Sequence, residues 1–293
     1  MTAERIANAQ YRLPPLAEVR HQLFPVIKYA LVVAGGIGTA LPFIWMVLSS
    51  FKTNADIGRI PMHWFPTEWI PQNYAKVFEI MPFARFYLNS IIVGVLTTLG
   101  ALLICSMAAY AFARIRFIGR DIMFMLILAT IMIPWWVTLI PAYLVIRQLG
   151  WLNTYQGLAV PGMLNIMGIF LLRQFFRTIP PDIEDAAFVD GASRLQIYAR
   201  IVLPMAKPAL LTVGLMTLMG SWNSLVWPLV ISQHESMRTL PLGLAVLANL
   251  AGWVRHETGA LLAATFLSIL PIVVIYMFLQ QYFIRGLALS GLK

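Results

Sequence analysis

Charge is scarce in this chain. Asp, Glu, Lys and Arg make up 11% of its 293 residues, whereas typical soluble domains carry about a quarter. Hydrophobic residues make up 60%, and the mean hydropathy is +0.77. With so few charged residues, a soluble domain would leave its apolar side chains uncovered. We therefore expect lipid to solvate much of the surface, and we predict an all-α integral membrane protein.

Residues that carry chemistry are also rare. Cys105 is the only cysteine, so the chain has neither an intrachain disulfide nor a CxxC site. No Gly-Lys dipeptide occurs, which excludes the GxxxxGK[ST] loop that cradles the phosphates of ATP. His234, Glu235, His256 and Glu257 do not form the HExxH pattern of a zinc site. We expect no catalytic residue, no metal site and no cofactor in this chain.

Long uncharged segments dominate the sequence. A helix that spans a membrane needs about 20 mostly apolar residues. Six windows without Asp, Glu, Lys or Arg reach that length: 29–51, 86–113, 122–146, 148–172, 208–234 and 258–284. They predict six transmembrane helices. The next longest window, 239–254, contains Pro241 and Gly243, and we interpret it as a loop or an interfacial helix.

Prolines interrupt several of these windows. The five that lie within a window are Pro134, Pro141, Pro161, Pro228 and Pro271. We expect kinks or broken helices there. Such breaks are tolerated in a membrane where backbone groups find protein or water partners, which favours a bundle that encloses a path.

The distribution of positive charge predicts the orientation. If each of the six windows crosses the membrane once, four segments lie on the same side of it: 1–28, 114–121, 173–207 and 285–293. They hold 14 of the 21 lysines and arginines. Cytoplasmic loops carry the excess of such residues, so both termini are expected in the cytoplasm. The net charge of +9 does not indicate nucleic-acid binding, because the cations are scattered and not gathered on one stripe.

The segment 173–207, between the fourth and fifth windows, is the most polar part of the chain apart from the N-terminal segment. Pro180 and Pro181 predict the start of a short helix whose first turn is acidic, as the positive N-terminus of a helix favours. Gly191 predicts its end. The acidic residues of the segment are Asp182, Glu184, Asp185 and Asp190.

A second short helix is expected after Gly191. Ser193 and Gln196 fit a capping box that begins it, and Pro204 is expected to end it before the fifth window. Ala186 and Ala187 leave the first helix flat enough for another protein to approach closely. The residues alone leave two interpretations open: a solvated loop whose acids cap helices, or a docking element on the cytoplasmic side.

This segment resembles the EAA loop of permease subunits of ATP-binding-cassette (ABC) importers. In that family Glu-Ala-Ala is followed by Gly and then by Ile-x-Leu-Pro at characteristic spacings. Here Asp185-Ala186-Ala187 precedes Gly191, and Ile201-Val202-Leu203-Pro204 follows at the matching distance, with Asp185 in place of the usual Glu. The resemblance implies a helix that docks on a partner ATPase. The predicted coupling residues are Glu184, Asp185, Ala186, Ala187, Asp190 and Gly191.

Other stretches narrow the resemblance. The sequences from Asn89 (NSIIVGVLTTLGALLICSMAAYAFARIRFIGRD), from Leu149 (LGWLNTYQGLAVPGMLNIMGIFLLRQFF) and from Trp222 (WNSLVWPLV) look like the carbohydrate-uptake branch, and most resemble the second, six-span permease of maltose-type importers. This implies a cytoplasmic segment over 1–27 and a permease domain over 28–293, with its core at about 85–285.

The resemblance also implies an assembly in a bacterial inner membrane. The expected partners are a second, homologous permease subunit, two copies of an ABC ATPase that binds ATP and Mg, an extracytoplasmic solute-binding protein, and membrane lipid. The outer segment 232–257 is similar to the part of such permeases that contacts the binding protein. In this assembly the chain would form half of the path and no nucleic acid would take part.

Polar and aromatic residues in apolar surroundings are the candidates for the solute path. Sugars favour amide hydrogen bonds and aromatic faces, and five residues offer them: Asn89, Asn165, Trp222, Asn223 and Trp227. Bonds between helices and anchoring at the interface are the alternative roles. A neutral oligosaccharide, a polyol, a uronic acid oligomer and glycerol phosphate all remain possible solutes, although the lack of fixed charge in the windows favours neutral or well-hydrated sugars.

Two other classes of membrane protein are disfavoured. A membrane-embedded enzyme needs polar catalytic groups inside its spans, and a channel or proton-coupled carrier usually needs ionisable ones. The six windows contain no Asp, Glu, Lys or Arg.

Overall fold

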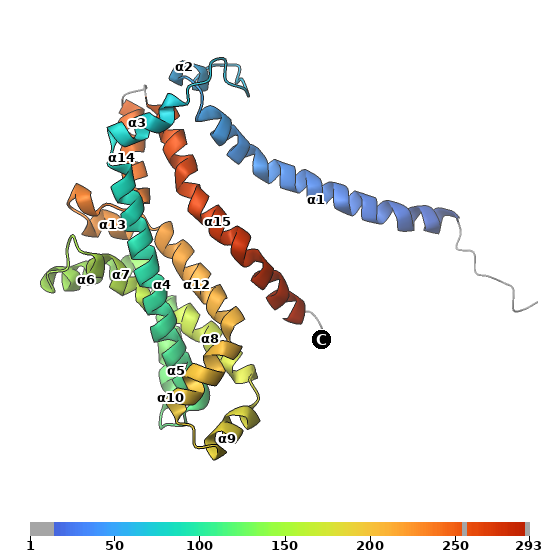
Figure 1. Cartoon of the computed structure of the whole chain (residues 1–293), viewed down its shortest axis with the longest axis vertical. Helices are drawn as coiled ribbons and strands as arrows, with labels where there is room; N and C mark the ends of the chain where they lie inside the picture. Colours follow the sequence, from blue (N-terminus) through green and yellow to red (C-terminus); the bar gives the residue numbers. More distant parts are fainter. Residues whose placement is uncertain (1–14, 254–256, 291–293) are drawn as a thin grey trace, which may run out of the picture.

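The computed structural model describes residues 15–253 and 257–290. Within these residues the chain consists of helices and connecting turns, with no strand (Figure 1). Most of the predicted segment 1–27 lies outside the described residues, and its described part, from Pro15, already belongs to the first helix. The predicted all-α class therefore holds for the described part of the chain.

Three helices are long and apolar enough to cross a membrane without interruption. They are α1 (Pro15–Ser49), α4 (Phe83–Arg114) and α15 (Thr258–Ser290), which match the predicted windows 29–51, 86–113 and 258–284. Helix α4 is central, because α7, α8 and α12 all pack against it. Helix α1 leans away from the rest of the molecule and packs mainly against α15 (Figure 1).

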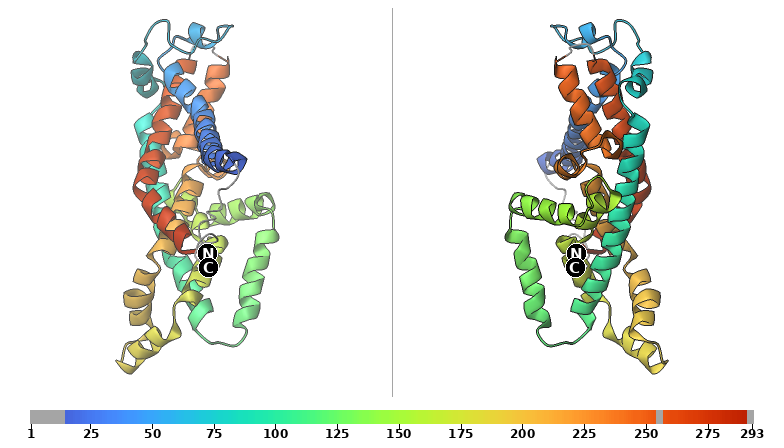
Figure 2. Two further views of the ribbon diagram at one scale, coloured as in Figure 1. Left: turned by 90° about the vertical axis from the view of Figure 1, so that its right-hand side faces the viewer. Right: turned by 90° about the vertical axis from the view of Figure 1, so that its left-hand side faces the viewer.

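The other three predicted windows are not continuous helices. Helix α5 (Arg120–Ala129) continues as the 3-10 turn η1 (Thr130–Met132) and meets α6 (Trp135–Gln148) at a bend of 103°. Helices α7 (Tyr155–Met163) and α8 (Ile166–Thr178) meet at 43°. Figure 2 shows α5 rising from one end of the molecule and α6 turning crosswise beside α4. Within residues 15–253 and 257–290, three helices are therefore long and apolar enough to be uninterrupted spans, and the number rises to six if each bent pair is one span.

The third bent pair begins before the fifth predicted window, 208–234. The segment Arg194–Met205 meets α12 (Lys207–Trp222) at 80°, and the window 208–234 divides into α12 and the short helix α13 (Val226–Ile231). The prediction of one helix over 208–234 is therefore wrong. Helix α12 ends at Trp222, because the backbone of Asn223 is no longer helical. The Asn223 N–H still donates to the carbonyls of Met219 and Ser221.

Proline explains one break. Pro134 directly precedes α6, where it lacks an N–H for the helical ladder. Helices α6, α7, α13 and α15 run through their own prolines without a break in the helix. The expected break is thus seen at Pro134, whereas the helix continues through the other four prolines.

Helix α14 (Leu240–Trp253) occupies the window predicted as a loop or interfacial helix. It is a helix, and it packs against α15 and α4 with Leu240, Leu242 and Leu247 buried. At about 1.5 Å per residue it measures about 21 Å, too short to cross a hydrocarbon core of about 30 Å.

The two ends of α4 support different structures. At the Phe83 end, which we call the α3 end, lie α2 (Asn54–Ile57), α3 (Gln72–Ile80), η3 (Glu235–Met237) and α14. At the Arg114 end, which we call the α9 end, lie the last turn of α8, α9 (Pro181–Val189) and α10 (Arg194–Ile197) (Figure 1). Each end has its own buried apolar cluster, and a third cluster joins the middle of α4 to α7.

Candidate functional site

Helix α9 has the local structure that its sequence predicts. Pro181 occupies its first turn together with the acidic residues Asp182 and Glu184. Gly191 follows the helix with φ +83, a left-handed conformation that disfavours residues with a Cβ atom. The chain therefore turns sharply after α9.

The second helix begins with the predicted capping box. The backbone N–H of Ser193 donates to Oε1 of Gln196 at 2.8 Å, and the N–H of Gln196 donates to the Ser193 hydroxyl at 3.3 Å. The helix continues through a π-helical turn, η2 (Tyr198–Val202), and α11 (Leu203–Met205). Pro204 lies in the first turn of α11, where a missing N–H costs no helical bond, so the helix passes Pro204. It ends one residue later, at Met205.

The six predicted coupling residues do not share one environment. Asp185, Ala186, Asp190 and Gly191 are exposed, and we call these four residues the exposed α9 face. Ala187 is half-buried. Glu184, in contrast, is only 6% exposed and points back into the protein.

The partner of Glu184 is Arg114, the last residue of α4. The Arg114 Nε atom lies 2.9 Å from Oε1 of Glu184, and the Tyr110 hydroxyl donates to Oε2 at 3.3 Å. Sequence analysis did not identify Arg114 or Tyr110. The position of Arg114, directly after the uncharged window 86–113, could have predicted an ion pair with a nearby carboxylate.

A polar notch lies beside the exposed α9 face. It has a volume of about 630 Å³ between the α9 end of α4, the start of α5, and helices α9 and α10. Four arginines and two carboxylates line it, and the Arg194 guanidinium lies 5.4 Å from the Phe188 ring centre. The charged residues are Arg114, Arg116, Arg120, Glu184, Asp185 and Arg194. Such a surface suits a protein partner with side chains of both signs.

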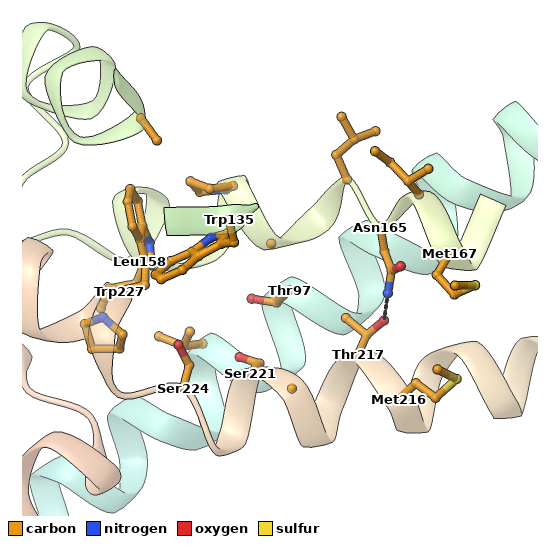
Figure 3. A pocket seen from close by; sticks show the side chains of 18 of the residues that line it. Thr97, Trp135, Leu158, Asn165, Met167, Met216, Thr217, Ser221, Ser224 and Trp227 are labelled. Carbon is orange, nitrogen blue, oxygen red and sulfur yellow. Dashed lines mark hydrogen bonds between the residues drawn. The ribbon is translucent and has the colours of Figure 1, made fainter. Parts of the chain in front are cut away.

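A second cavity lies beside the middle of α4, and we call it the central cavity. Its volume is about 510 Å³, and α4, α6, α7, α8, α12 and α13 contribute to its lining. Among the described residues that line it, none is charged. Its polar groups are the side chains of Thr97, Asn165, Thr217, Ser221 and Ser224, and two indole rings, Trp135 and Trp227, face it (Figure 3).

Two of the five predicted path residues lie at this cavity. The Asn165 side chain caps α8 by accepting the N–H of Gly168 at 2.9 Å, and its amide donates to the Thr217 hydroxyl at 3.1 Å (Figure 3). The Trp227 ring N–H donates to the Gly157 carbonyl at 3.0 Å. Both side chains are therefore held in place by protein partners while they line the cavity.

The other three predicted path residues do not line the cavity. Asn89 is fully buried, and its amide donates to the Ser236 and Arg238 carbonyls, each at 2.9 Å. Trp222 is 6% exposed and donates to the Ser268 carbonyl at 3.2 Å. Asn223 is exposed and donates to Met219, one turn earlier. Asn89 thus bonds to a loop and Trp222 to another helix, whereas Asn223 bonds within its own helix.

The hydroxyl groups that line the cavity were not predicted from the sequence. Thr217 and Ser221 are one turn apart on α12, so they lie on the same face of that helix. Two hydroxyls at this spacing on an otherwise apolar helix were the signal. Within residues 15–253 and 257–290, no group of three or more His, Cys, Asp or Glu side chains could hold a metal ion.

Known proteins that are similar to this chain in sequence include permease components of transport systems. The family described as "Binding-protein-dependent transport system inner membrane component" matches residues 100–289. The probable ABC transporter permease protein YurM of Bacillus subtilis is 33% identical over 88% of this chain and 85% of its own length. The trehalose/maltose transport system permease protein MalG of Thermococcus litoralis is 32% identical over 92% of this chain and 98% of its own.

A solved structure has the same fold. One chain of a bacterial ABC transporter involved in the import of the acidic polysaccharide alginate superimposes with a TM-score of 0.80 at 26% identity. The alignment covers 89% of this chain and 97% of that one.

Proposed function

The chain belongs to the binding-protein-dependent transport system inner membrane components, in the carbohydrate-uptake branch of ABC importer permeases, and we propose that it forms half of the translocation path of such an importer. The solute is a sugar or oligosaccharide that a binding protein delivers. Energy comes from ATP hydrolysis by a partner ATPase, since this chain is a permease and not an enzyme. The observation that carries the proposal is the uncharged, hydroxyl-lined central cavity beside α4.

The proposed topology has six spans: α1, α4, the bent pairs α5–α6 and α7–α8, α12 with α13, and α15. The segment Arg194–Met205 stays on the same side as α9. The α9 end of α4 faces the cytoplasm, together with both chain termini. The excess of Lys and Arg on that side supports this orientation. The α3 end, with η3 and the start of α14, then faces the binding protein.

The chemistry of the central cavity favours a neutral solute. Hydroxyl and amide groups match the hydroxyls of a sugar, and the rings of Trp135 and Trp227 offer apolar faces to its C–H groups. A uronic acid or a phosphate would need a compensating charge in so apolar a place. A volume of about 510 Å³ falls in the range of small-molecule sites, about 300–1,000 Å³.

The exposed α9 face is the proposed docking site for the ATPase. Asp185 and Asp190 supply charge, Ala186 allows close approach, and the adjacent notch offers arginines to acidic side chains of the partner. Closure of two ATPase subunits around ATP would move both α9 helices of the permease pair. The path would then alternate between outward-facing and inward-facing states, a two-state change that nucleotide binding biases.

Reconstitution tests the proposal directly. The complete importer, with its second permease, ATPase and binding protein, is placed in proteoliposomes, and uptake of labelled sugars is measured with and without ATP. We expect uptake only with ATP and with the ATPase present. Uptake that proceeds without the ATPase would contradict the proposal.

Two neighbouring substitutions test the cavity. Ser224 lines the central cavity, whereas the adjacent Asn223 is exposed outside it. Ser224→Trp should place an indole ring in the cavity and reduce uptake by more than about tenfold, because the ring would occupy space that a solute needs. Asn223→Trp introduces the same ring outside the cavity and should leave most uptake intact. Equal uptake by the two variants would exclude the cavity from the path.

A further inference from the structure

A polar stripe runs along α4 at its α9 end. Ser106, Tyr110 and Arg114 follow one another at intervals of one helical turn, so they lie on the same face of the helix. Ser106 is 2% exposed, Tyr110 is 5% exposed and the Arg114 side chain is 13% exposed. Three buried polar groups on one face of a membrane helix require partners.

The segment 184–198 supplies these partners. The Ser106 and Tyr198 hydroxyls lie 2.7 Å apart, the Tyr110 hydroxyl donates to Glu184 at 3.3 Å, and the Arg114 Nε atom lies 2.9 Å from the other oxygen of Glu184. The Tyr110 ring also packs on the Tyr198 ring, with centroids 5.3 Å apart. Helix α9 and the turn η2 are thus attached to the same face of α4.

Arg114 also holds the end of α8. Its Nη2 atom donates to the Phe176 carbonyl at 2.7 Å and to the Ile179 carbonyl. The last carbonyls of a helix lack partners within the helix and favour a nearby cation. One guanidinium therefore joins α4, α8 and α9.

Burial makes this attachment sensitive to the loss of either partner. Removing one member of a buried ion pair leaves the other charge uncompensated, which is far less favourable than breaking an exposed pair. Apart from the contacts of Glu184, α9 packs on the buried apolar cluster through half-buried Ala187, and its Phe188 ring lies near Arg194. The buried pair fixes α9 to α4, while the exposed α9 face stays free for a partner.

We infer that Arg114 and Glu184 are positioning residues that lock α9 to α4, so that a displacement of α9 reaches the central cavity through α4. This inference rests on the proposed function. Helix α4 is continuous from Arg114 to Thr97, which lines the cavity, and the two residues are about 25 Å apart at about 1.5 Å per residue. Glu184 therefore acts inside the subunit, whereas its neighbour Asp185 faces outward.

Two carboxylates on the same helix provide a matched test. Glu184→Gln keeps the side-chain size and removes the charge that faces Arg114, whereas Asp182→Asn makes the same change on an exposed side chain of α9. In the reconstituted importer, the ratio of solute transported to ATP hydrolysed is measured for each, together with the amount of ATPase that co-purifies. We expect Glu184→Gln to retain the ATPase but to lower the ratio at least about tenfold, and Asp182→Asn to keep the ratio.

A distance measurement separates a positioning role from simple misfolding. Spin labels are attached at Val189 on α9 and at Leu103 on α4, both exposed, in a Cys105→Ser background. We expect one narrow distance with and without ATP in the parent protein, and a broad or ATP-dependent distribution after Glu184→Gln. An unchanged narrow distance with an unchanged transport ratio would overturn the inference.

The two measurements also distinguish this inference from the proposed function. If the parent importer shows no ATP-dependent uptake, the proposed function fails. The distance between α9 and α4 in Glu184→Gln still decides whether the pair fixes the helix. If uptake depends on ATP but Glu184→Gln behaves as the parent in both measurements, only the inference fails.

Discussion

The two ends of helix α4 are attached to the rest of the chain by different chemistry. At the α3 end, the neutral amide of Asn89 and the hydroxyl of Ser90 bind backbone groups of residues 236–240. At the α9 end, the attachment is a buried ion pair between Arg114 and Glu184. The bonds at the α3 end, together with one from the exposed Arg85 guanidinium to the Ser236 carbonyl, all end on backbone groups and hold one arrangement of the loop. The charged end holds a helix whose opposite face stays exposed, and we interpret it as the end on which another subunit acts.

The strongest test of this difference is a change in the turn after α9. Gly191 has φ +83, and the space around it is open, so a side chain there meets strain but no clash. Gly191→Val should cost about 1–3 kcal/mol of backbone strain and displace the exposed α9 face. We expect coupled transport to fall by about fivefold to a hundredfold, since each 1.4 kcal/mol corresponds to about tenfold, while membrane insertion stays normal.

The control for this change uses the same position. Asn tolerates the left-handed conformation better than other residues with a Cβ atom, so Gly191→Asn should retain most coupled transport. Uptake and ATP hydrolysis are measured in proteoliposomes. If Val and Asn at position 191 transport equally well, the α9 end does not depend on this turn.

The next effect concerns the α3 end and is expected in stability. Asn89→Asp replaces two amide donors by a carboxylate that faces the Ser236 and Arg238 carbonyls. We expect a loss of about 3 kcal/mol, because buried polar groups lose their partners and a charge is buried. Asn223→Asp alters an exposed amide and should change stability by less than about 0.5 kcal/mol. Thermal unfolding of the purified protein compares them, and similar melting temperatures would argue against a neutral clamp at Asn89.

A smaller, pH-dependent effect is expected in the loop beside α2. The backbone N–H of Thr67 donates to Asp56 at 3.0 Å, and this bond, assisted by the charge of Lys52, lowers the pKa of Asp56 below its usual 3.8. Because the folded pKa lies below the unfolded value, this contribution to stability is complete above about pH 4. It is lost as the pH falls through the folded pKa.

Amide hydrogen exchange of Thr67 measures this effect. Protection, corrected for the intrinsic rate, should be constant between about pH 5 and 8 and decrease below about pH 4. Asp56→Asn should remove this dependence. A decrease that persists in Asp56→Asn would assign the transition to another group. It would then show that the α3 end contains a further charge-dependent contact.

The smallest expected effect comes from an ion pair at the α3 end. The Lys76 Nζ atom lies 2.8 Å from Oε1 of Glu257, but the two side chains are 43% and 22% exposed. Exposed pairs contribute about 0–1 kcal/mol and are screened by salt. A double-mutant cycle with Lys76→Gln and Glu257→Gln, followed by thermal unfolding at low and high salt, should give a coupling below about 1 kcal/mol. A larger, salt-independent value would make the two ends of α4 alike.

Much of the fold could be predicted from the absence of charge, but the shapes of the spans could not. Three windows correspond to long, continuous helices: 29–51, 86–113 and 258–284. The window 122–146 looks equally apolar, yet it bends by 103°. Pro134 accounts for a break but not for its angle, which depends on how α6 packs against neighbours distant in sequence. Hydropathy also gave no reason to separate α13 from α12.

The candidate site was predictable where the signal is local. The start of α9 at Pro181, the stop at Gly191 and the capping box at Ser193 depend on a few adjacent residues. The directions of Glu184 and Asn89 depend on tertiary contacts. Glu184 and Asp185 look alike in the sequence, and only the packing of α9 against α4 places one inside and one outside.

The bend between α5 and α6 has a consequence for biogenesis. Each half is about 20 Å long at about 1.5 Å per residue, whereas a bilayer core is about 30 Å thick. Neither half is long enough to leave the translocon as an independent span. We expect the two halves to partition into lipid together, after α4 has already been inserted and offers them a surface. Exposed apolar residues such as Met132 and Ile140 would then make an unassembled copy of this subunit a substrate for membrane proteases, so its cellular lifetime should depend on synthesis of its partners.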